Sequence, residues 1–466
     1  QDINGNRIKV DCSFKLNSNN EVSFELGKYD KNYTLVIDPS LIFSTYSGST
    51  SDNFGYTACF DQFGFLYSGS TVFGAIGAYP TTVGAYQTSF AGGTGNGNAG
   101  TDIAISKYDT TGGFMVYSTL LGGNSDELPH SIITNSNDEI FILGTTGSAN
   151  FPMTSNAYDT TFAGGSNLAP AGLGIRFPNG SDIFVARLSA NGQNLMASTF
   201  VGGSANDGLN IGAATKFNYA DEVRGEIMVD DNNNCFIVSS TLSNDFPTTT
   251  NAFQKTIGGA LDAVVFKMDN NLTTLVWSTY LGGTLNDAGY AMELDKKGDI
   301  YITGGTASTD FDTTAGTLQT TFQGGQADGF ISHLSANGSN LLHSTYWGTT
   351  SYDQSYFVEL DRSNNVHVFG QTQHNGSFFI NNAFKGCFLL FISTFTARAV
   401  CLTYPYTCFV RNRDKNFFLF FRERLQKSHD LSFYTRVNFF LRLTLINSRD
   451  FVFFRLGCVF TIQSNL

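Results

Sequence analysis

The chain has 466 residues, a formal net charge of −12 and 41% hydrophobic residues, a length that suits two or three ordinary domains or most of one repeat-built domain. Gly is frequent, with 49 residues, and Pro is rare, with 8, which is typical of many short strands joined by tight turns. The acidic balance repels nucleic acid and anionic membrane surfaces, and no segment combines sustained helical periodicity with caps, so neither a nucleic-acid-binding nor a helical protein is expected.

The first 40 residues contain three strand-like segments. Two of them, within residues 7–16 and 21–26, alternate apolar and polar side chains, and residues 33–38 form a third run. Three strands do not make a domain, and the chain starts at Gln1 without a methionine or an apolar signal segment. We therefore expect residues 1–40 to be the C-terminal edge of a β-domain that begins upstream.

Residues 41–384 repeat themselves. A strand that ends in Ser-Thr and is followed by a glycine turn recurs with spacings of 74, 80, 80 and 66 residues, its serines being Ser44, Ser118, Ser198, Ser278 and Ser344. A second marker, an aspartate that opens a strand, has spacings of 80, 80 and 66 and comprises Asp102, Asp182, Asp262 and Asp328. The two markers move together, which indicates one structural repeat.

Two further markers complete each repeat. One is an Asp/Asn-rich or glycine turn before an alternating strand, as in residues 295–306. The other is a loop motif, with the sequence Phe-Pro-Thr-Thr at residues 246–249 and variants of it at 79–82, 151–154 and 311–314. Four strands per repeat follow, so we predict an all-β fold, a β-propeller of four-stranded antiparallel blades. A series of β-sandwiches is the alternative, but a sandwich usually needs seven or more strands.

The order of these markers resembles the SBBP repeat, a seven-bladed β-propeller repeat of large bacterial surface and secreted proteins. Residues 27–30 and 35–39 look like the domain that commonly precedes such repeats. The resemblance covers about residues 20–384 and implies an exported adhesive or scaffold module rather than a reaction. Asp312 in place of the loop proline and extra residues at 166–180 depart from the pattern. Only about four to five blades are visible, so we expect the propeller to be incomplete.

The composition changes abruptly after residue 384. Residues 385–466 carry 12 Lys and Arg against 4 Asp and Glu, which makes this tail +8 and the preceding part −20. A membrane anchor that starts at Gly386 would be interrupted by Arg398, well short of the roughly 20 residues that a spanning helix needs. A separate domain would need more turn residues. We expect an aberrant tail that is not natively folded and that arises from a reading-frame shift near codon 385, which the coding DNA can decide.

Three motifs that bind ligands in other folds are interpreted as loops. Residues 95–100 have G-x-G-x-x-G spacing without the flanking strand and helix, and residues 92–95 give one copy of a calcium β-roll motif without its aspartate. Asp230 begins a run with EF-hand spacing, but Cys235 and Thr241 stand where that loop needs Gly and Glu. An Asx turn is the simpler interpretation, and calcium at an inter-blade turn stays open.

The histidines and cysteines form no recognisable constellation. His130, His333, His343 and His367 fall at unrelated phases, and His343 takes a strand position that Tyr117 and Trp277 fill in other repeats, so we expect it to be packed. The isolated residues Cys12, Cys59 and Cys235 predict no disulfide framework, but small core side chains.

The marker aspartates have two interpretations. A ring of equivalent carboxylates could bind a cation or serve as acid and base. A catalytic residue is rarely needed in every copy, so a turn or blade-to-blade hydrogen-bonding device is the simpler interpretation.

The predicted function is a non-catalytic, secreted or cell-surface binding, adhesion or scaffold propeller. Its partner would be a protein or glycan that contacts the loops around residues 79–100, 151–181, 246–260 and 311–326. We predict no catalytic, cofactor-binding or metal-binding residue, no cofactor, no nucleic acid, no membrane span and no specific oligomer. The alternative is a polysaccharide lyase or glycoside hydrolase with a site at the central channel. Such an enzyme needs charged residues that break the repeat symmetry there, and few are expected.

Overall fold

The computed structural model describes residues 45–374 apart from 75–78, 93–99, 171–173 and 362, together with parts of the first 33 residues and the strands after residue 389. Two compact units are present, one of Gln1–Ser44 with Tyr404–Leu466 and one of Thr45–Thr403. The described elements are strands apart from one short 3-10 helix. The fold is therefore all-β, as predicted.

The larger unit contains five sheets of four antiparallel strands, and each sheet keeps the order of the chain. We name these sheets blades 1 to 5. Blades 1 and 2 consist of β5 (Asn53–Phe60), β6 (Leu66–Phe73), β7 (Thr101–Tyr108), β8 (Met115–Leu121), β9 (Glu127–Thr134), β10 (Ile140–Thr146), β11 (Asp182–Leu188) and β12 (Leu195–Val201). Blades 3 to 5 consist of β13 (Glu226–Val229), β14 (Cys235–Thr241), β15 (Asp262–Met268), β16 (Leu275–Leu281), β17 (Asp287–Leu294), β18 (Ile300–Thr306), β19 (Asp328–Leu334), β20 (Leu341–Trp347), β21 (Asp353–Leu360), β22 (Val366–Thr372), β23 (Leu390–Ser393) and β24 (Thr396–Ala399).

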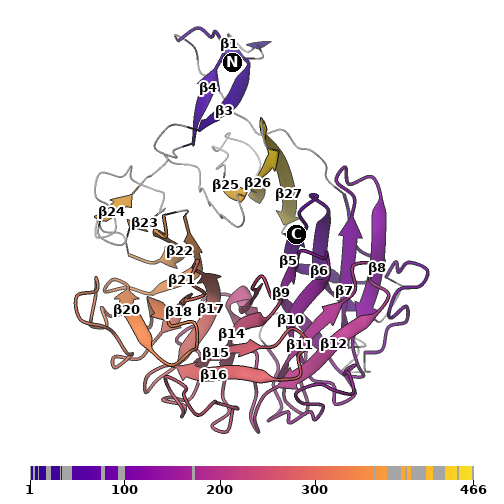
Figure 1. Ribbon diagram of the computed structural model, residues 1–466, viewed down its shortest axis with the longest axis vertical. Helices are drawn as coiled ribbons and strands as arrows, with labels where there is room; N and C mark the ends of the chain where they lie inside the picture. Colours follow the sequence, from indigo (N-terminus) through magenta and orange to yellow (C-terminus); the bar gives the residue numbers. More distant parts are fainter. Residues whose placement is uncertain are drawn as a thin grey trace, which may run out of the picture. The chain divides into compact units, whose positions relative to one another are not determined.

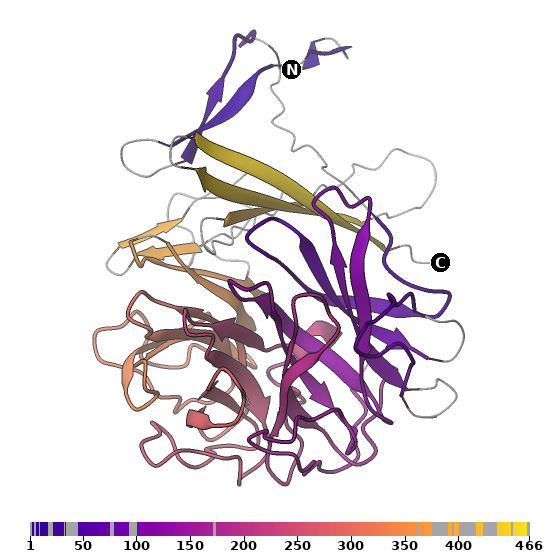
Figure 2. The same ribbon diagram turned by 45° about the vertical axis from the view of Figure 1, so that its right-hand side comes forward.

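The blades are arranged around one axis. Their first strands, β5, β9, β13, β17 and β21, lie beside one another in chain order, and the fourth strands lie at the outside (Figure 1). The turned view shows neighbouring sheets standing face to face (Figure 2). Their facing side chains form the core, for example where Tyr67 and Ile103 of blade 1 pack with Ile142 and Phe184 of blade 2. Stacking buries both faces of each sheet, so this is the predicted propeller with blade-type repeats.

Two of the repeated motifs, the Phe-Pro-Thr-Thr loop and the Ser-Thr strand, form hydrogen bonds with each other. In blade 2, Thr154 of the loop motif accepts a hydrogen bond from the Ser198 amide at 3.2 Å and donates one to the Ser198 carbonyl at 3.2 Å. Thr199 donates to the Asp159 carbonyl at 3.1 Å. Equivalent Thr–Ser contacts recur in blades 1, 3 and 4. In blades 1 to 4 the loop therefore covers the edge of the fourth strand, which would otherwise offer unpaired backbone groups to another chain.

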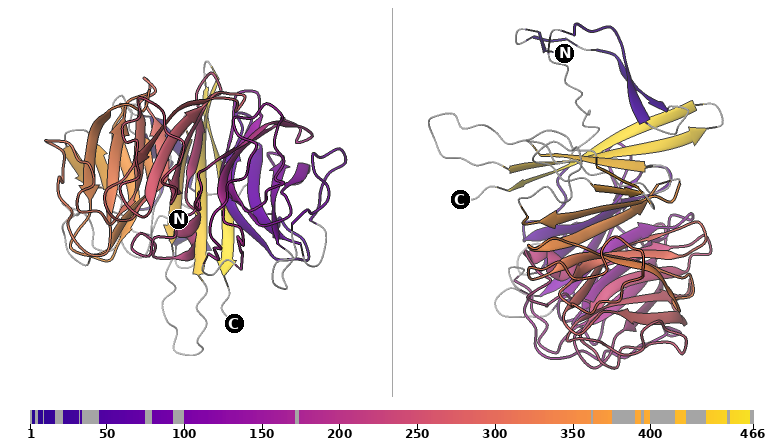
Figure 3. Two further views of the ribbon diagram at one scale, coloured as in Figure 1. Left: turned by 90° about the horizontal axis from the view of Figure 1, so that it is seen from below. Right: turned by 90° about the vertical axis from the view of Figure 1, so that its left-hand side faces the viewer.

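The smaller unit contains short hairpins and a three-stranded sheet (Figure 3). Its strands are β1 (Asp2–Ile3), β2 (Asn6–Arg7), β3 (Cys12–Leu16), β4 (Val22–Leu26), β25 (Asn416–Arg422), β26 (Arg436–Ser448) and β27 (Phe451–Gln463). The β3–β4 hairpin matches the two predicted alternating segments, whereas the run at 33–38 lies largely outside the described residues.

The tail contributes strands to both units, β23 and β24 to blade 5 and β25–β27 to the smaller unit. The reading-frame interpretation of this tail stays a prediction. Among the described residues, no helix has the length and apolar character needed to cross a bilayer.

Candidate functional site

An insertion precedes blade 3. In the other blades the glycine that follows the Ser-Thr strand stands 13 positions before the Asp/Asn turn, as with Gly48 and Asp61, but Gly202 stands 28 positions before Asp230. The additional residues at about 208–225 contain the 3-10 helix η2 (Tyr219–Val223). Asn218 caps this helix by accepting from the Ala220 amide at 2.8 Å, and Asp221 reciprocates by accepting from the Asn218 amide at 3.1 Å. These two hydrogen bonds fix the direction in which the chain of the insertion enters the helix.

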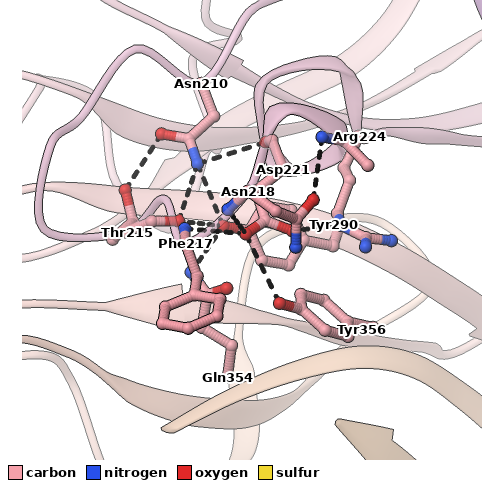
Figure 4. A network of polar contacts seen from close by, with 10 residues as sticks. Asn210, Thr215, Phe217, Asn218, Asp221, Arg224, Tyr290, Gln354 and Tyr356 are labelled. Atoms are coloured by element: carbon pink, nitrogen blue, oxygen red, sulfur yellow. Dashed lines mark hydrogen bonds and ion pairs between the residues drawn. The ribbon is translucent and has the colours of Figure 1, made fainter. Parts of the chain in front are cut away.

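The insertion reaches the innermost strands of blades 4 and 5 through a hydrogen-bond network (Figure 4). Asn210 Nδ2 donates to the Thr215 carbonyl at 2.9 Å and to the Tyr290 hydroxyl on β17 at 2.9 Å. Gln354 on β21 donates to the same Thr215 carbonyl and, at 2.8 Å, to the Tyr290 hydroxyl. Hydrogen bonds from the insertion thus connect the first strand of blade 4 with the first strand of blade 5. The side chains that they join, Tyr290 and Gln354, are 64 residues apart in the sequence.

A buried ion pair lies beside this network. Asp221 accepts from the Phe217 amide at 2.8 Å and from Arg224 Nε at 3.0 Å. The Arg224 guanidinium carbon lies 3.8 Å from the ring centroid of Tyr356, and the Tyr356 hydroxyl donates to Asp221 at 3.4 Å. Burial is the largest cause that raises the pKa of Tyr356 and of Tyr290, so both phenols remain protonated donors.

A second ion pair and an apolar layer complete the insertion. Lys216 Nζ lies 2.5 Å from Glu222 Oε1. Leu209 and Val223 pack in one cluster with Ile175 and Phe177, which belong to the extra residues noted at 166–180. The insertion before blade 3 and the extra residues at 166–180 therefore stabilise each other through this apolar contact.

The chemistry available to this site follows from its burial. Asn210, Asp221, Tyr290 and Gln354 are at most 3% exposed. The expectation that few charged residues break the repeat symmetry near the axis is wrong, because the insertion supplies Lys216, Asp221, Glu222 and Arg224. These charges are paired with one another, however, and general acid–base catalysis requires a carboxylate within reach of substrate. The arrangement suits a fixed axial plug.

The marker aspartates are a hydrogen-bonding device, as the simpler interpretation held. Each opens a third strand and is fully buried. Asp262 accepts from the Gly258 amide at 2.7 Å, the Gly259 amide at 3.1 Å and the Gln254 side chain at 3.2 Å. Asp102, Asp182 and Asp328 accept from equivalent loop amides.

A second carboxylate faces each marker aspartate from the next blade. A Cβ placed on Gly122 would lie 2.5 Å from Asp102 Oδ1 and 2.8 Å from Glu127 Oε2, so this glycine separates the two carboxylates. The equivalent residues at the other boundaries are Asp207, Asp287 and Asp353. Burial raises the pKa of all four marker aspartates to about 7. The protonation state of these carboxylate pairs is therefore sensitive to pH near neutrality.

The Asp230 motif is an Asx turn. Asp230 Oδ1 accepts from the Asn232 amide at 2.9 Å and the Asn234 amide at 2.8 Å, and Oδ2 is 3.1 Å from Lys267 Nζ. The G-x-G-x-x-G segment lies outside the described residues except for Gly100, and a strand rather than a helix follows it.

His130 and His343 occupy two different settings. His130 on β9 is buried 3.1 Å from the Thr145 hydroxyl, and burial lowers its pKa to about 3, so it is neutral. His343 is on a strand but exposed, and the expectation that it is packed is wrong. In blades 1 and 3 the turn of the next blade covers this position, with the Cβ position of Gly338 only 2.4 Å from Trp277. For His343 the corresponding turn lies outside the described residues.

The cysteines agree in part with the core interpretation. Cys235 is buried, Cys59 is half-buried, and the side chain of Cys12 lies outside the described residues.

The axial network is the site that sequence reasoning missed. Its signal was the longer interval between Gly202 and Asp230, which marks an insertion but not its contacts.

Two segments of the chain match known families. Residues 276–312 match SBBP, described as a beta-propeller repeat, and residues 1–40 match DUF7948, a domain of unknown function. The first match begins in β16 and ends within the loop motif after β18, so it includes the Ser-Thr strand, its glycine turn and the Asp-rich turn between β17 and β18. No curated protein matches the chain.

Several solved structures are similar in fold. A protein of unknown function from Dyadobacter fermentans aligns with a TM-score of 0.40 at 11% identity and covers 83% of this chain and 93% of its own. An ulvan lyase, titled as a new family of polysaccharide lyase, gives 0.41 at 9% identity with coverage of 85% and 83%. The NanB sialidase from Streptococcus pneumoniae gives 0.34 at 8% identity with coverage of 93% and 66%. At these TM-scores the likenesses carry no argument about function.

Proposed function

This chain is a β-propeller with SBBP-type repeats, and we propose that it is a non-catalytic binding or scaffold module that presents its blade loops to a polymeric ligand. The observation that carries the proposal is the axial plug. The charged side chains that break the repeat symmetry, Asp221, Arg224, Glu222 and Lys216, are engaged with one another rather than directed at a substrate. The repeated carboxylates likewise serve hydrogen bonds at the blade boundaries.

The ligand-facing surface in this proposal is the set of loops between the second and third strands. Their threonines hold the fourth-strand edges, but other side chains in them are free to contact a ligand. Val83 is 101% exposed, Leu318 58% and Tyr158 37%. One such loop per blade gives several weak contacts on one molecule, and linked weak contacts raise overall affinity. Exposed hydroxyl, amide and aromatic groups favour a glycan as the first ligand to test, with a protein partner as the other outcome.

The proposal includes a location. A repeated module that binds polymers through surface loops fits an extracellular or cell-surface setting, as the SBBP resemblance implies. Protease treatment of intact cells of the natural source, followed by detection of the chain, tests this. Protection of the chain until the cells are lysed would contradict a surface or secreted location.

Binding and catalysis are separated by one experiment. The full chain is applied to an array of neutral and uronate-containing polysaccharides, and the same polymers are incubated with it in solution while reducing ends and unsaturated uronates are measured. We expect binding to at least one polymer with no product. Release of product that disappears in Asp221→Asn would replace the proposal with the polysaccharide-acting enzyme.

A matched pair of variants locates the binding surface. Leu318→Ser changes a side chain that is 58% exposed in a ligand-facing loop, and Phe63→Ser changes one that is 59% exposed in the turn between β5 and β6, at the opposite end of a blade. We expect only Leu318→Ser to weaken binding, by several-fold. Equal loss in both variants, or no loss in either, would contradict this surface.

A further inference from the structure

One position recurs in blades 1 to 4, five residues after the marker aspartate on the third strand. It holds a basic side chain, the four being Lys107, Arg187, Lys267 and His333. In each blade the basic group lies against an aromatic ring of the second-strand region and near the turn between the first and second strands. The first three blades show what this position does, and blade 4 departs from it.

Blades 1 to 3 pair one fixed cation with one carboxylate. Lys107 Nζ lies 3.1 Å from Asp61 Oδ2 and 4.6 Å from the centroid of Phe65. Lys267 Nζ lies 3.1 Å from Asp230 Oδ2 and 4.3 Å from the ring centroid of Phe236.

Blade 2 keeps the same plan with a longer pair. Arg187 has a nitrogen 4.0 Å from Glu139 Oε2, and its guanidinium carbon is 5.7 Å from the ring centroid of Phe141. The basic side chain therefore has a carboxylate partner in all three blades.

Blade 4 has two carboxylates and no fixed cation at this position. Asp295 and Asp299 both belong to the turn, and His333 stacks on Tyr301 with ring centroids 4.0 Å apart and planes at 12°. Both ring nitrogens of His333 are buried without a hydrogen-bond partner. Two carboxylates thus lie beside an imidazole whose nitrogens have no hydrogen-bond partner, while the charge of Lys297, in the same turn, also acts on His333.

The geometry of the three side chains suits an ion. One ligand atom from each lies within 4.8 Å of the others, and His333 Nε2 is 4.0 Å from Asp299 Oδ2. Ligand atoms of a tetrahedral zinc ion are about 3.4 Å apart, so small side-chain rotations suffice. Asp295 Oδ1 accepts from the Asp299 amide at 3.0 Å and Asp299 Oδ1 accepts from the Ala336 amide at 2.8 Å. These hydrogen bonds fix one oxygen of each carboxylate and leave the other oxygen available to coordinate an ion.

We propose that Asp295, Asp299 and His333 bind a divalent transition-metal ion of the zinc class, in place of the lysine or arginine of the other blades. Nitrogen from imidazole and oxygen from carboxylates are donors that such ions accept. His343 faces His333 across the β19–β20 pair, with ring centroids 5.8 Å apart. The ion would clamp the β17–β18 turn to β19.

The test measures zinc binding to the full chain after removal of metal by a chelator. His333→Lys is the decisive variant, because it restores the residue of blades 1 and 3 and supplies its own charge. We expect the unaltered chain to bind one more zinc ion than His333→Lys, and its melting temperature to rise with ZnCl₂ at this site only while His333 is present. Asp299→Asn should weaken the same site by at least about 100-fold.

A control variant and two contrary outcomes complete the test. His367→Gln alters another histidine near a carboxylate, 3.6 Å from Asp361, and should leave the zinc count unchanged. The proposal is overturned if the unaltered chain binds no zinc, or if His333→Lys binds as many ions with the same affinity. Should His333→Lys not fold, as judged by circular dichroism, then unchanged zinc binding in Asp299→Asn overturns the proposal by itself.

Discussion

The blade boundaries and the axial insertion both contain buried carboxylates, and each region satisfies them differently. At the boundary between blades 3 and 4, the charge of Asp287 helps to raise the pKa of Asp262, and among the described residues no lysine or arginine forms an ion pair with either. In the insertion, Asp221 has Arg224 and Glu222 has Lys216. The carboxylates at the repeated boundaries are stabilised by hydrogen bonds from backbone amides and by protonation, whereas those in the insertion are stabilised by ion pairs. The two regions should therefore respond differently to mutation and to pH.

The largest effect is expected at the axis. Asp221→Ala leaves Arg224 without its partner and the Phe217 and Asn218 amides without an acceptor. Breaking a buried pair of this kind costs about 3–5 kcal/mol. Urea unfolding of the full chain measures this cost, with Asp231→Ala at an exposed position as the control that should change stability by less than about 0.5 kcal/mol. Similar stability of the two variants would contradict the plug.

A glycine at a blade boundary should come next. A Cβ on Gly282 would lie 2.5 Å from Asp262 Cγ, and hydrogen bonds to Gly258 and Gly259 hold that carboxylate in place. We expect Gly282→Ala to lose about 2–3 kcal/mol of unfolding free energy. Gly55→Ala has nothing within 4 Å of the new atom and should be nearly neutral in the same urea titration. A neutral Gly282→Ala would mean that the carboxylate pair is free to move apart.

Changes of pH should act on the boundaries. Burial raises the pKa of Asp182 and Asp262 to about 7 and of Asp207 to about 8, from ordinary values near 4. A carboxyl group with a raised folded-state pKa favours folding below its unfolded pKa, and that contribution is lost as the pH rises through the folded pKa. The melting temperature should therefore rise when the pH is lowered from 8 to 5.5.

Three histidines oppose this trend, because burial also lowers the pKa of His333 and His367. The pKa of His130 is lowered to about 3, so its contribution to stability is lost as the pH falls below about 6.5. The raised carboxyl groups outnumber these histidines in this window. A melting temperature that is constant or falls between pH 8 and pH 5.5 would show that the boundary pairs do not control the response.

The smallest effect should come from neutralising one member of a boundary pair. Asp287→Asn keeps an oxygen that can accept from the Gly283 amide and the Ser308 hydroxyl, and it removes the repulsion on Asp262. We expect about 1 kcal/mol of stabilisation at pH 8 and almost none at pH 5.5. Asp310→Asn should do the opposite at pH 8, since hydrogen bonds from Thr284 lower the pKa of Asp310. Equal effects of Asp287→Asn at both pH values would argue against a proton that is shared between Asp262 and Asp287.

The repeat markers made most of the fold predictable because each one does a local task. A Ser-Thr strand, a glycine turn and an aspartate such as Asp262 form the same contacts in successive blades, so spacing alone gave four strands per blade and their order. The role of residues 246–249 and their equivalents was less accessible. Their covering of the fourth-strand edge depends on a contact with Ser278, which lies 29 residues further along the chain than Thr249.

Sequence by itself therefore determined the repeat, the all-β class and the presence of extra residues before blade 3. Only the tertiary structure decided what the extra residues touch, because Asn210, Tyr290 and Gln354 belong to three repeats and come together only when the first strands surround one axis. The same holds for Asp295, Asp299 and His333. The alignment of His333 with Lys107 and Lys267 is visible in the sequence, but the burial that leaves its ring nitrogens without partners arises from packing that includes the Tyr301 ring.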